Sequence, residues 1–338
     1  MSSQSDESAV LFHPRGQSKA ATFGVRLRAH LQIMRLDHSI KNIFVIPGIV
    51  VPLSVLRTPL LSPPLVWNIL VGFLAITLIA CSNYVLNELL DAPFDRLHPK
   101  KRNRPTAQGL VSVPVAYAQW LLMMAAGIAL AVTISRPFAY TAGALWVMGC
   151  FYNTPPFRTK DKVYLDVLSE SVNNPLRMLL GWFMVTSALI PPASLLLCYW
   201  MIGCYLMALK RFSEYREIGS AQVAGTYRKS FQYYTEVSLL TSVNFYACVA
   251  MLFFGTFIMR YRIEWILVFP LLALMMATYF KLAFQPNSAA QNPEKLYREP
   301  LLMTEAILIS VLMITLLYVD IPVIGRIFAP TLPTVLGH

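Results

Sequence analysis

The chain has 338 residues, of which 56% are hydrophobic and 13% are charged, and its mean hydropathy is +0.54. Soluble proteins carry about twice that share of charge, so the composition excludes a soluble enzyme and a disordered scaffold and indicates a membrane protein. Lysine and arginine outnumber aspartate and glutamate by 28 to 17, which gives a net charge of +11. Cytoplasmic loops of membrane proteins are rich in basic residues, so we ascribe much of this excess to topology and expect no nucleic acid partner.

The amino-terminal segment 1–30 is polar and basic and lacks the apolar core of a signal peptide, so we expect it in the cytosol. Residues 31–338 are predicted to form one all-α transmembrane domain, because a bilayer span needs about 20 apolar residues. About nine spans are expected, at 41–57, 65–87, 110–133, 137–154, 163–190, 193–209, 233–258, 263–284 and 301–325.

The distribution of basic residues fixes the expected orientation. Nine spans with a cytosolic start place the long polar loops near 88–109, 210–230 and 285–300 on the cytoplasmic side. Of the 28 basic residues, 22 then lie on that side, five lie on the other, and Arg177 lies within a span. The positive-inside rule therefore predicts a multi-pass protein of the cell (inner or plasma) membrane whose amino terminus and long polar loops face the cytosol.

Several common chemistries find no support in the sequence. The cysteines Cys81, Cys150, Cys198, Cys204 and Cys248 lie in apolar stretches without C-x-x-C spacing, which predicts buried packing rather than zinc binding or disulfides. No G-x-G-x-x-G, P-loop or H-E-x-x-H motif occurs, so dinucleotide binding, Walker-type hydrolysis and zincin chemistry are not indicated.

An acidic stripe ends the second expected span. Asn87, Asp91 and Asp95 are spaced by four residues, so they share one face if the helix continues to Asp95. Clustered carboxylates repel one another unless a cation neutralises them, and hard oxygen ligands suit a Mg²⁺ ion shared between protein and substrate phosphates. A solvated helix end is the alternative reading.

Cations follow the stripe directly. The segment from His98 to Pro105 contains Lys101 and Arg104, which we expect to take phosphate charge that the metal leaves uncovered. Lys100 and Arg102 fit a topological or lipid-facing role equally well.

The fifth expected span carries an unusual buried stripe. Asp166, Glu170, Asn173 and Arg177 follow spacings of four, three and four residues and share one helix face. Charged groups facing lipid are costly, so this face is predicted to line a wet cavity or to pair internally. Arg177 is expected either to contact substrate or to form an ion pair with Glu170 or Asp166, and Asn173-Asn174-Pro175 is a candidate helix break.

Two further helix ends complete the pattern. Lys210, Glu214 and Glu217 share a face at the end of the sixth span, and Lys41 and Asn42 begin the first. An ion channel has no need for so many cations beside its carboxylates. The arrangement predicts a Mg²⁺-bound, phosphate-rich substrate at the cytosolic mouth of a helical bundle.

These residues resemble the UbiA-type intramembrane prenyltransferases. The N-x-x-x-D-x-x-x-D motif of that superfamily is matched by Asn87, Asp91 and Asp95, and its Tyr-to-Lys loop motif by Tyr152 to Lys160. Within the superfamily, Arg35-x-x-x-Ser39-x-Lys41-Asn42, the His98 to Pro105 run and Lys210-Arg211-Phe-Ser-Glu214 with Tyr227-Arg228 look most like decaprenyl-phosphate phosphoribosyltransferases. The resemblance covers nearly all of the chain after residue 30.

The resemblance implies transfer of 5-phosphoribosyl from 5-phosphoribosyl diphosphate (PRPP) to a polyprenyl phosphate, with Mg²⁺ as cofactor, the bilayer and both substrates as partners, and a possible homo-oligomer. Where the ordinary prenyltransferase pattern has a second D-x-x-x-D, this chain has Lys210-x-x-x-Glu214, which suits a substrate with an extra phosphate. The implied catalytic residues are Asp91, Asp95, Lys210 and Tyr152; the substrate-binding residues are Lys41, Asn42, Lys101, Arg104, Arg158, Lys160, Arg177 and Arg211; and the metal ligands are Asn87, Glu88, Asp91, Asp95 and Glu214.

Two other functions stay open at this point. Prenyl transfer from a diphosphate to an aromatic or quinone-precursor acceptor uses the same metal-diphosphate chemistry. A transporter could use Asp166, Glu170 and Arg177 as an ion relay, although the sequence shows no inverted repeat. Asn173-Asn174-Pro175 departs from the small and apolar residues expected in the phosphoribosyltransferases, which leaves the acceptor open.

Overall fold

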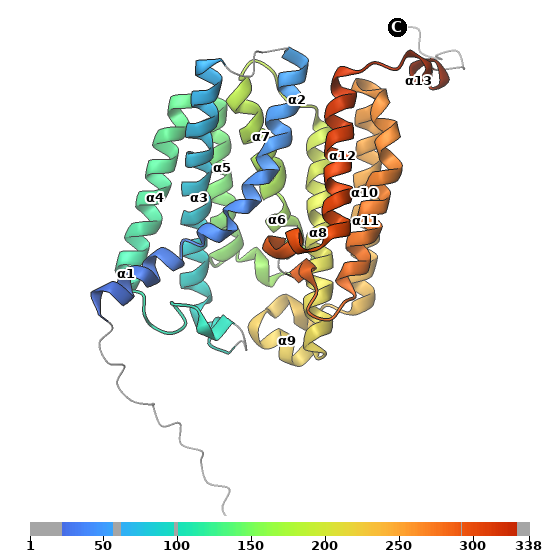
Figure 1. Cartoon of the computed structure of the whole chain (residues 1–338). Coiled ribbons are helices and arrows are strands. Elements are labelled where there is room, and N and C mark those ends of the chain that lie inside the picture. The colour runs from blue at the N-terminus through green and yellow to red at the C-terminus, as the bar shows by residue number, and fades with distance from the viewer. Residues whose placement is uncertain (1–21, 57–61, 98–100, 292, 330–338) are drawn as a thin grey trace, which may run out of the picture.

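The computed structural model describes residues 22–56, 62–97, 101–291 and 293–329, and every regular element within them is helical (Figure 1). The α-helices are α1 (Phe23–Gln32), α2 (Ile46–Leu56), α3 (Pro63–Asp95), α4 (Val113–Ile134), α5 (Arg136–Asn153), α6 (Leu165–Ser171), α7 (Asn173–Val185), α8 (Ala193–Ile218), α9 (Ala221–Tyr227), α10 (Glu236–Tyr261), α11 (Phe269–Ala283), α12 (Pro300–Tyr318) and α13 (Pro322–Ile327). Shorter 3₁₀ segments are η1 (Leu36–Val45), η2 (Lys101–Asn103), η3 (Thr159–Asp161), η4 (Lys229–Gln232), η5 (Ile263–Val268), η6 (Ala289–Gln291) and η7 (Pro293–Arg298).

The predicted all-α membrane fold is confirmed. Within the described ranges, seven helical segments are long and apolar enough to cross a bilayer: 23–56, 63–95, 113–134, 193–218, 236–261, 263–283 and 300–318. The two other predicted spans, 137–154 and 163–190, correspond to α5 and to the pair α6 and α7. The count of nine spans therefore stays a prediction.

The fifth predicted span is broken near its middle. Helix α6 ends at Ser171 and α7 begins at Asn173, directly at the Asn173-Asn174-Pro175 sequence that suggested a break. Proline lacks a backbone N–H and weakens a regular helix when it lies in the interior, and here it occupies the first turn of α7, where that N–H is not needed. The break exposes a polar stretch of chain to the middle of the bundle.

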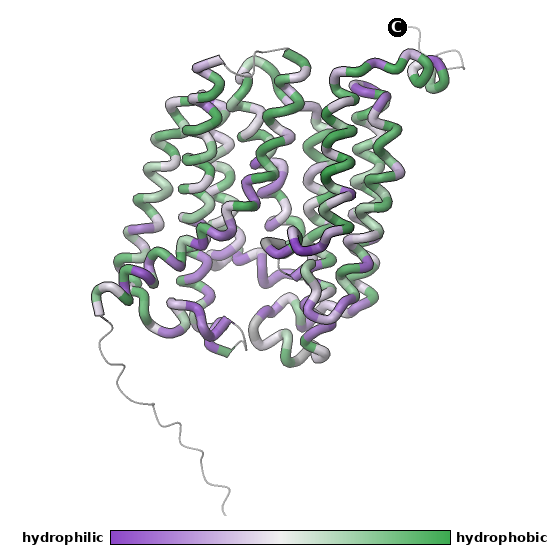
Figure 2. The backbone as a smooth tube through the Cα atoms, in the orientation of Figure 1, coloured by the Kyte–Doolittle hydropathy of each residue, from purple (hydrophilic) through white to green (hydrophobic). Residues whose placement is uncertain are grey.

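Charge collects at one end of the bundle. Helix α1, η2 and α9 lie at this end, whereas α13 lies at the opposite end (Figure 1), and hydrophilic stretches of the tube concentrate near α1, η2 and α9 (Figure 2). The predicted cytoplasmic loops are thus gathered on one side of the molecule. The predicted segment 1–30 lies mostly outside the described residues, and only its last part is seen, as α1.

Two helices are longer than the hydrocarbon core of a bilayer is thick. Helix α3 has 33 residues and α8 has 26. At 1.5 Å per residue these helices are about 50 and about 39 Å long, whereas the hydrocarbon core is about 30 Å thick. The C-terminal parts of these helices carry Asp91 and Asp95 on α3 and Lys210 and Glu214 on α8.

The apolar core has several parts, one of which joins α2 and α7 to α8, α10 and α12. One cluster joins η1, α2, α3, α5 and α7 and includes Ile76, Leu145 and Leu180. Another joins α8, α10 and α11 and includes Leu209 and Tyr246. The cysteines follow the predicted burial in part: Cys81, Cys198 and Cys204 are buried and Cys150 is half-buried, but Cys248 is exposed on α10, where an apolar stretch faces outward.

Glycines set the contact between α2 and α7. A Cβ atom at Gly48 would lie 1.9 Å from the Met178 carbonyl oxygen, and one at Gly181 would lie 2.2 Å from the Val45 carbonyl oxygen. These neighbours are backbone atoms, so they move only if a helix moves. The close approach holds α7, and with it Arg177, against the first span.

Replacing Gly181 with alanine should destabilise the bundle. We expect Gly181→Ala to lower the free energy of unfolding by about 1–3 kcal/mol, because the added methyl forces α7 away from η1. The measurement is reversible unfolding in mixed micelles followed by circular dichroism.

Gly143→Ala in α5 is the matched control, since a Cβ there meets nothing within 4 Å. Its higher helix propensity predicts unchanged or slightly increased stability. Equal stability of both variants would contradict the close-packing interpretation.

Candidate active site

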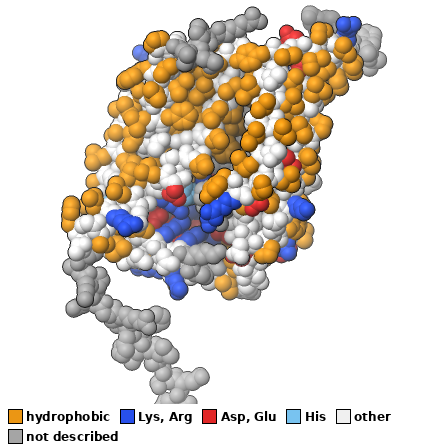
Figure 3. All heavy atoms as spheres, in the orientation of Figure 1, with side chains coloured by type: hydrophobic (Ala, Val, Ile, Leu, Met, Phe, Trp, Pro, Cys, Tyr) orange, Lys and Arg blue, Asp and Glu red, His pale blue; other side chains and the backbone are white. Residues whose placement is uncertain are grey.

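A cavity of about 1360 Å³ lies between the two halves of the bundle and reaches its charged end. Residues from η1, α3, α5, α7, α8, α11 and α12 line it, together with the loops that carry η2 and η3. In the space-filling view, lysine, arginine and acidic side chains gather in a hollow beneath a mostly apolar face (Figure 3). The cavity therefore combines a charged mouth with apolar walls.

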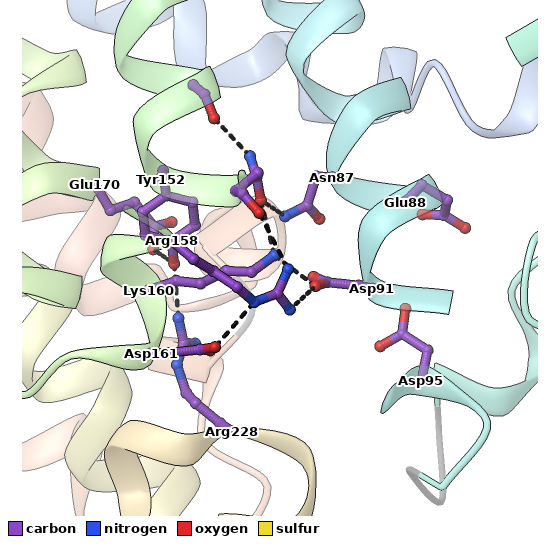
Figure 4. A network of polar contacts seen from close by, with 12 residues as sticks. Asn87, Glu88, Asp91, Asp95, Tyr152, Arg158, Lys160, Asp161, Glu170 and Arg228 are labelled. Carbon is purple, nitrogen blue, oxygen red and sulfur yellow. Dashed lines mark hydrogen bonds and ion pairs between the residues drawn. The ribbon is translucent and has the colours of Figure 1, made fainter. Parts of the chain in front are cut away.

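The acidic stripe of α3 lines this cavity as its spacing predicts. Helix α3 continues to Asp95, and Asn87, Asp91 and Asp95 all contribute to the lining. Glu88 points to the opposite side of α3 from Asp91 (Figure 4) and does not contribute to the lining. This predicted metal ligand therefore lies outside the cavity lining, although it shares Arg104 with Asp95.

Asp91 is the meeting point of α3 with the loop after α5. Its Oδ1 accepts from Lys160 Nζ at 2.5 Å and from Arg158 Nη2 at 3.0 Å. The Asn153 side-chain oxygen accepts from Lys160 at 2.8 Å and from Asn87 at 2.5 Å (Figure 4). The two ends of the Tyr152 to Lys160 loop motif are thereby connected to the acidic stripe.

Arg158 is held in an uncommon backbone conformation. Its φ of 30° lies in the left-handed region, which is disfavoured for a residue with a Cβ atom. The guanidinium also donates to the Asn153 carbonyl at 3.0 Å and to Asp161 at 2.9 Å. Contacts on three sides fix this arginine with one edge toward Asp91.

The second α3 carboxylate is paired with the cationic segment that follows the helix. Arg104 Nη1 donates to Asp95 Oδ2 at 2.5 Å, and Arg104 Nε lies 3.8 Å from Glu88 Oε2. Glu88 also accepts from Thr106 at 3.3 Å and is 2% exposed. Glu88 therefore serves to fix the segment after α3 against the helix.

Arg211 of α8 forms ion pairs with two acidic residues of α6 and with one of its own helix. It lies 2.8 Å from Glu170, 3.1 Å from Glu214 and 3.4 Å from Asp166, and its side chain is 3% exposed. The Tyr152 hydroxyl donates to Glu170 at 2.7 Å and accepts from Arg228 at 2.7 Å. Both acids that were considered as partners of Arg177 are instead paired with Arg211.

Lysine protonation at the mouth is sensitive to burial. Burial lowers the pKa of Lys160 to about 8, although the neighbouring Asp91 favours the charged form. Burial likewise lowers the pKa of Lys101, whose Nζ lies 3.8 Å from Glu214. These lysines thus release their protons more readily than a solvated lysine does.

Some of the cations at the cavity form no close ion pair. Among the described residues, Lys41, Arg177 and Lys210 have no carboxylate oxygen within 4 Å, although all three line the cavity. Lys41 Nζ lies instead over the ring of Tyr84, 5.9 Å from its centroid. Cations without a carboxylate in direct contact are the groups best able to bind a substrate anion.

Most predicted site residues meet at the cavity, and a few do not. Those that line it are Asn87, Asp91, Asp95, Tyr152, Arg158, Lys160, Lys101, Arg104, Lys41, Arg177, Lys210, Arg211 and Glu214. Asn42 is buried and donates to Thr77 at 3.0 Å, so it secures η1 to α3 without contributing to the lining. Asn153 and Arg228 were not given roles from the sequence, although both lie within the segments that carry the family resemblance.

The carboxylates of the mouth fit a metal ion that arrives with a substrate. In the part of the chain that the structure describes, no three His, Cys, Asp or Glu side chains lie close enough to hold a metal by themselves. Asp91 and Asp95 are one helical turn apart. Asp91 forms its ion pair through Oδ1, and Asp95 forms its ion pair through Oδ2. Magnesium commonly takes one or two carboxylates, water and phosphate oxygens, which this pair can provide with a diphosphate.

Comparison with known proteins agrees with this geometry. Decaprenyl-phosphate phosphoribosyltransferase from Mycolicibacterium smegmatis is 29% identical over 169 residues, which are 49% of this chain and 50% of that protein. Protoheme IX farnesyltransferase 2 from Vibrio parahaemolyticus is 29% identical over 147 residues, which are 42% of this chain and 50% of that protein. The chain thus matches about half the length of these curated relatives.

The fold also matches a solved structure. A UbiA homologue from Archaeoglobus fulgidus bound to DMAPP and Mg²⁺ superposes with a TM-score of 0.65 at 19% identity, covering 86% of this chain and 97% of that one. A model of the UbiA prenyltransferase family matches residues 44–304, which is well over half of the sequence and contains nearly all of the cavity. The chain is therefore an integral membrane protein that belongs to the UbiA prenyltransferase family.

Proposed function

We propose that this protein transfers 5-phosphoribosyl from PRPP to a polyprenyl phosphate and releases pyrophosphate, with Mg²⁺ as cofactor and with the charged mouth in the cytosol. The observation that carries the proposal is the charge of the cavity. Ten lysines and arginines of the described residues line it, against six aspartates and glutamates. PRPP carries a diphosphate and a separate phosphate, and the acceptor adds a third phosphate group, so this reaction brings unusually high negative charge into one site.

The phosphate groups would bind at two sides of the mouth, one at α3 and one at α8. Asp91 and Asp95 would hold Mg²⁺ on the diphosphate, and the metal would neutralise the leaving pyrophosphate. Lys101, Arg104 and Lys160 lie beside those carboxylates and are placed to bind the remaining phosphate oxygens. Lys210 lies on α8 across the cavity. No carboxylate of the described chain lies within 4 Å of Lys210, so this lysine could bind a further phosphate group.

The chemistry needs positioning more than proton transfer. The C1–O bond of PRPP breaks and its electrons leave with pyrophosphate, while an oxygen of the acceptor phosphate forms the new bond to C1. The attacking phosphate is already anionic at neutral pH, so no general base is required. The main barrier to the reaction is the repulsion between two anionic substrates. The cations of the cavity offset this repulsion and bring the two reacting groups together.

The apolar wall provides room for the lipid. Phe44 of η1, Leu206 of α8, Met275 and Met276 of α11, and Met303 of α12 line the same cavity as the charged mouth. Flexible methionine side chains adapt to irregular apolar chains. A polyprenyl tail can lie along this wall while its phosphate meets the soluble donor at the mouth.

Prenyl transfer from a diphosphate to an aromatic acceptor is the second candidate, because the farnesyltransferase relative matches as well as the phosphoribosyltransferase does. An allylic cation is stabilised by aromatic walls and paired carboxylates. The cationic excess of the cavity, and Lys210 where a carboxylate is expected, favour the phosphate-rich reaction.

Supplying two donor systems to the purified protein distinguishes the candidates. We expect pyrophosphate release with PRPP and decaprenyl phosphate in the presence of Mg²⁺, and no release when EDTA replaces the metal. Pyrophosphate release only with a prenyl diphosphate and a hydroxybenzoate would contradict phosphoribosyl transfer.

Removing one charge from Asp91 should abolish turnover. We expect Asp91→Asn to reduce the rate by at least about 100-fold, because the metal-diphosphate group loses an anionic ligand and Lys160 loses its partner. Asp320→Asn is the matched control: Asp320 is 76% exposed and pairs with Arg262 at the other end of the bundle. Full activity of the Asp91→Asn variant would contradict a metal-binding role for Asp91.

Raising the pH should weaken pyrophosphate binding through Lys160. Since the pKa of Lys160 is about 8, the ammonium group is present below that pH and is lost above it. Each lost interaction of this kind changes affinity by at most about tenfold per pH unit. We expect titration calorimetry of Mg²⁺-pyrophosphate to show weaker binding at pH 9 than at pH 7.

Lys160→Arg tests the assignment, because a guanidinium remains charged over this range. The variant should show a smaller loss of affinity between pH 7 and pH 9 than the native protein. Identical pH profiles would show that Lys160 is not the titrating group.

A further inference from the structure

The inner part of the cavity contains a cation that the reaction at the mouth does not use. Arg177 is 6% exposed and lines the cavity from α7, one turn before Gly181. The close contact of α7 with the first span, which Gly181 permits, fixes its position. Arg177 therefore belongs to a rigid part of the bundle rather than to a surface loop.

Protein groups satisfy this guanidinium poorly. Its Nη1 donates to the Asn173 carbonyl at 3.4 Å, near the upper limit for such a bond, and its side chain also forms a hydrogen bond with the side chain of Tyr84. Its Nε atom is buried without a hydrogen-bond partner. Arg177 also interacts with Tyr84 and Tyr199, but it forms no ion pair within 4 Å with a described carboxylate. A purely structural arginine would be expected to pair these donors.

Two acceptor atoms are left open around the same cavity. Asn83 Oδ1 on α3 and Asn173 Oδ1 on α7 are both buried without a partner, and both residues line the cavity. The Asn83 amide is fixed, because its Nδ2 donates to the Leu145 carbonyl at 3.1 Å. It also packs against Gly149, where a Cβ would lie 2.2 Å from the side chain. The oxygen of Asn83 is thus held in place as an acceptor.

These atoms call for a particular ligand chemistry. A guanidinium donor without a counter-ion suits an oxyanion, and open amide oxygens suit hydroxyl groups. One small molecule that carries an oxyanion and hydroxyls would satisfy all of them. Sugar phosphates and hydroxybenzoates both have this combination.

The subsite is separate from the metal-binding carboxylates. Asn83 precedes Asp91 by eight residues on α3, which is about 12 Å along the helix axis. Asn87 lies between them and is engaged with Asn153. A ligand with phosphate groups at both ends can therefore reach both places.

We propose that Arg177, Asn83 and Asn173 form an inner subsite for an oxyanion and the hydroxyl groups beside it. Resting on the proposed function, the inference assigns these groups to the 5-phosphate and ribose hydroxyls of PRPP. The inner subsite then determines which donor is accepted, while Asp91 and Asp95 act on the diphosphate.

Equilibrium binding to the full-length protein in nanodiscs tests the subsite with three separate probes. Ribose 5-phosphate without metal probes the inner subsite, 4-hydroxybenzoate probes the alternative source of the same chemistry, and Mg²⁺-pyrophosphate probes the mouth. We expect Arg177→Gln to weaken ribose 5-phosphate binding by at least about tenfold, because a charge-assisted hydrogen bond is lost. Mg²⁺-pyrophosphate binding should stay unchanged, which also shows that the variant is folded.

Two further variants sharpen the test. Asn173→Asp leaves Arg177 in place but puts a carboxylate four residues before it on the same helix face, which should also weaken ribose 5-phosphate binding by neutralising the guanidinium. Arg136→Gln is the matched control, since Arg136 is exposed at the first turn of α5 and does not line the cavity. It should bind all probes as the native protein does.

Each other outcome overturns a defined part. Unchanged ribose 5-phosphate affinity in Arg177→Gln, or no binding of this probe to the native protein, would overturn the inner subsite for sugar phosphate. Binding of 4-hydroxybenzoate alone through Arg177 would reassign the subsite to an aromatic acceptor. Failure of Mg²⁺-pyrophosphate to bind the native protein would instead count against the proposed function itself.

Discussion

The ion pair between Asp91 and Lys160 connects α3 to the loop after α5, and the other charged groups of the candidate active site lie around it. Charges near a bilayer core are tolerated only when they are paired or wet. Asp91 on α3 satisfies this condition by accepting from Lys160 and Arg158, which belong to the loop after α5. In the proposed reaction the same groups change partners, because a metal-bound diphosphate offers Asp91 a cation and offers Lys160 an anion. In that reaction, substrate binding would therefore replace the contacts of Asp91 with Lys160 and Arg158.

Helix geometry explains why these groups meet. Helices α3 and α8 are longer than a bilayer core is thick, so their charged last turns extend to one end of the bundle. The break before Asn173 turns the polar face of α6 toward Arg211, while Gly181 fixes α7 against the first span. The result is a cavity with a charged mouth and a polar inner wall. Such a site can hold a phosphorylated donor at two points and leave an apolar wall for a lipid.

Much of the fold could be predicted from the sequence because hydrophobic length and charge distribution act locally. The spans, the continuation of α3 through Asp95 and the break near Asn173 all follow from such patterns. Pairing between distant segments could not be predicted in the same way. The spacing that puts Asn87, Asp91 and Asp95 on one face does not predict that Lys160 pairs with Asp91. Likewise, Glu88 reads as a metal ligand in sequence, but its helical position turns it toward Thr106 and Arg104. Arg211, rather than Arg177, takes Asp166 and Glu170, because α8 crosses α6 at that level.

The most direct measurement uses Mn²⁺ in place of Mg²⁺ and records ³¹P electron-nuclear double resonance on the protein with pyrophosphate. If Asp91 and Asp95 hold a metal ion on the diphosphate, the spectrum should show strong phosphorus coupling to bound Mn²⁺, and Asp91→Asn should abolish the protein-bound signal. Tight pyrophosphate binding without metal, or bound Mn²⁺ without phosphorus coupling, would contradict the metal-diphosphate site.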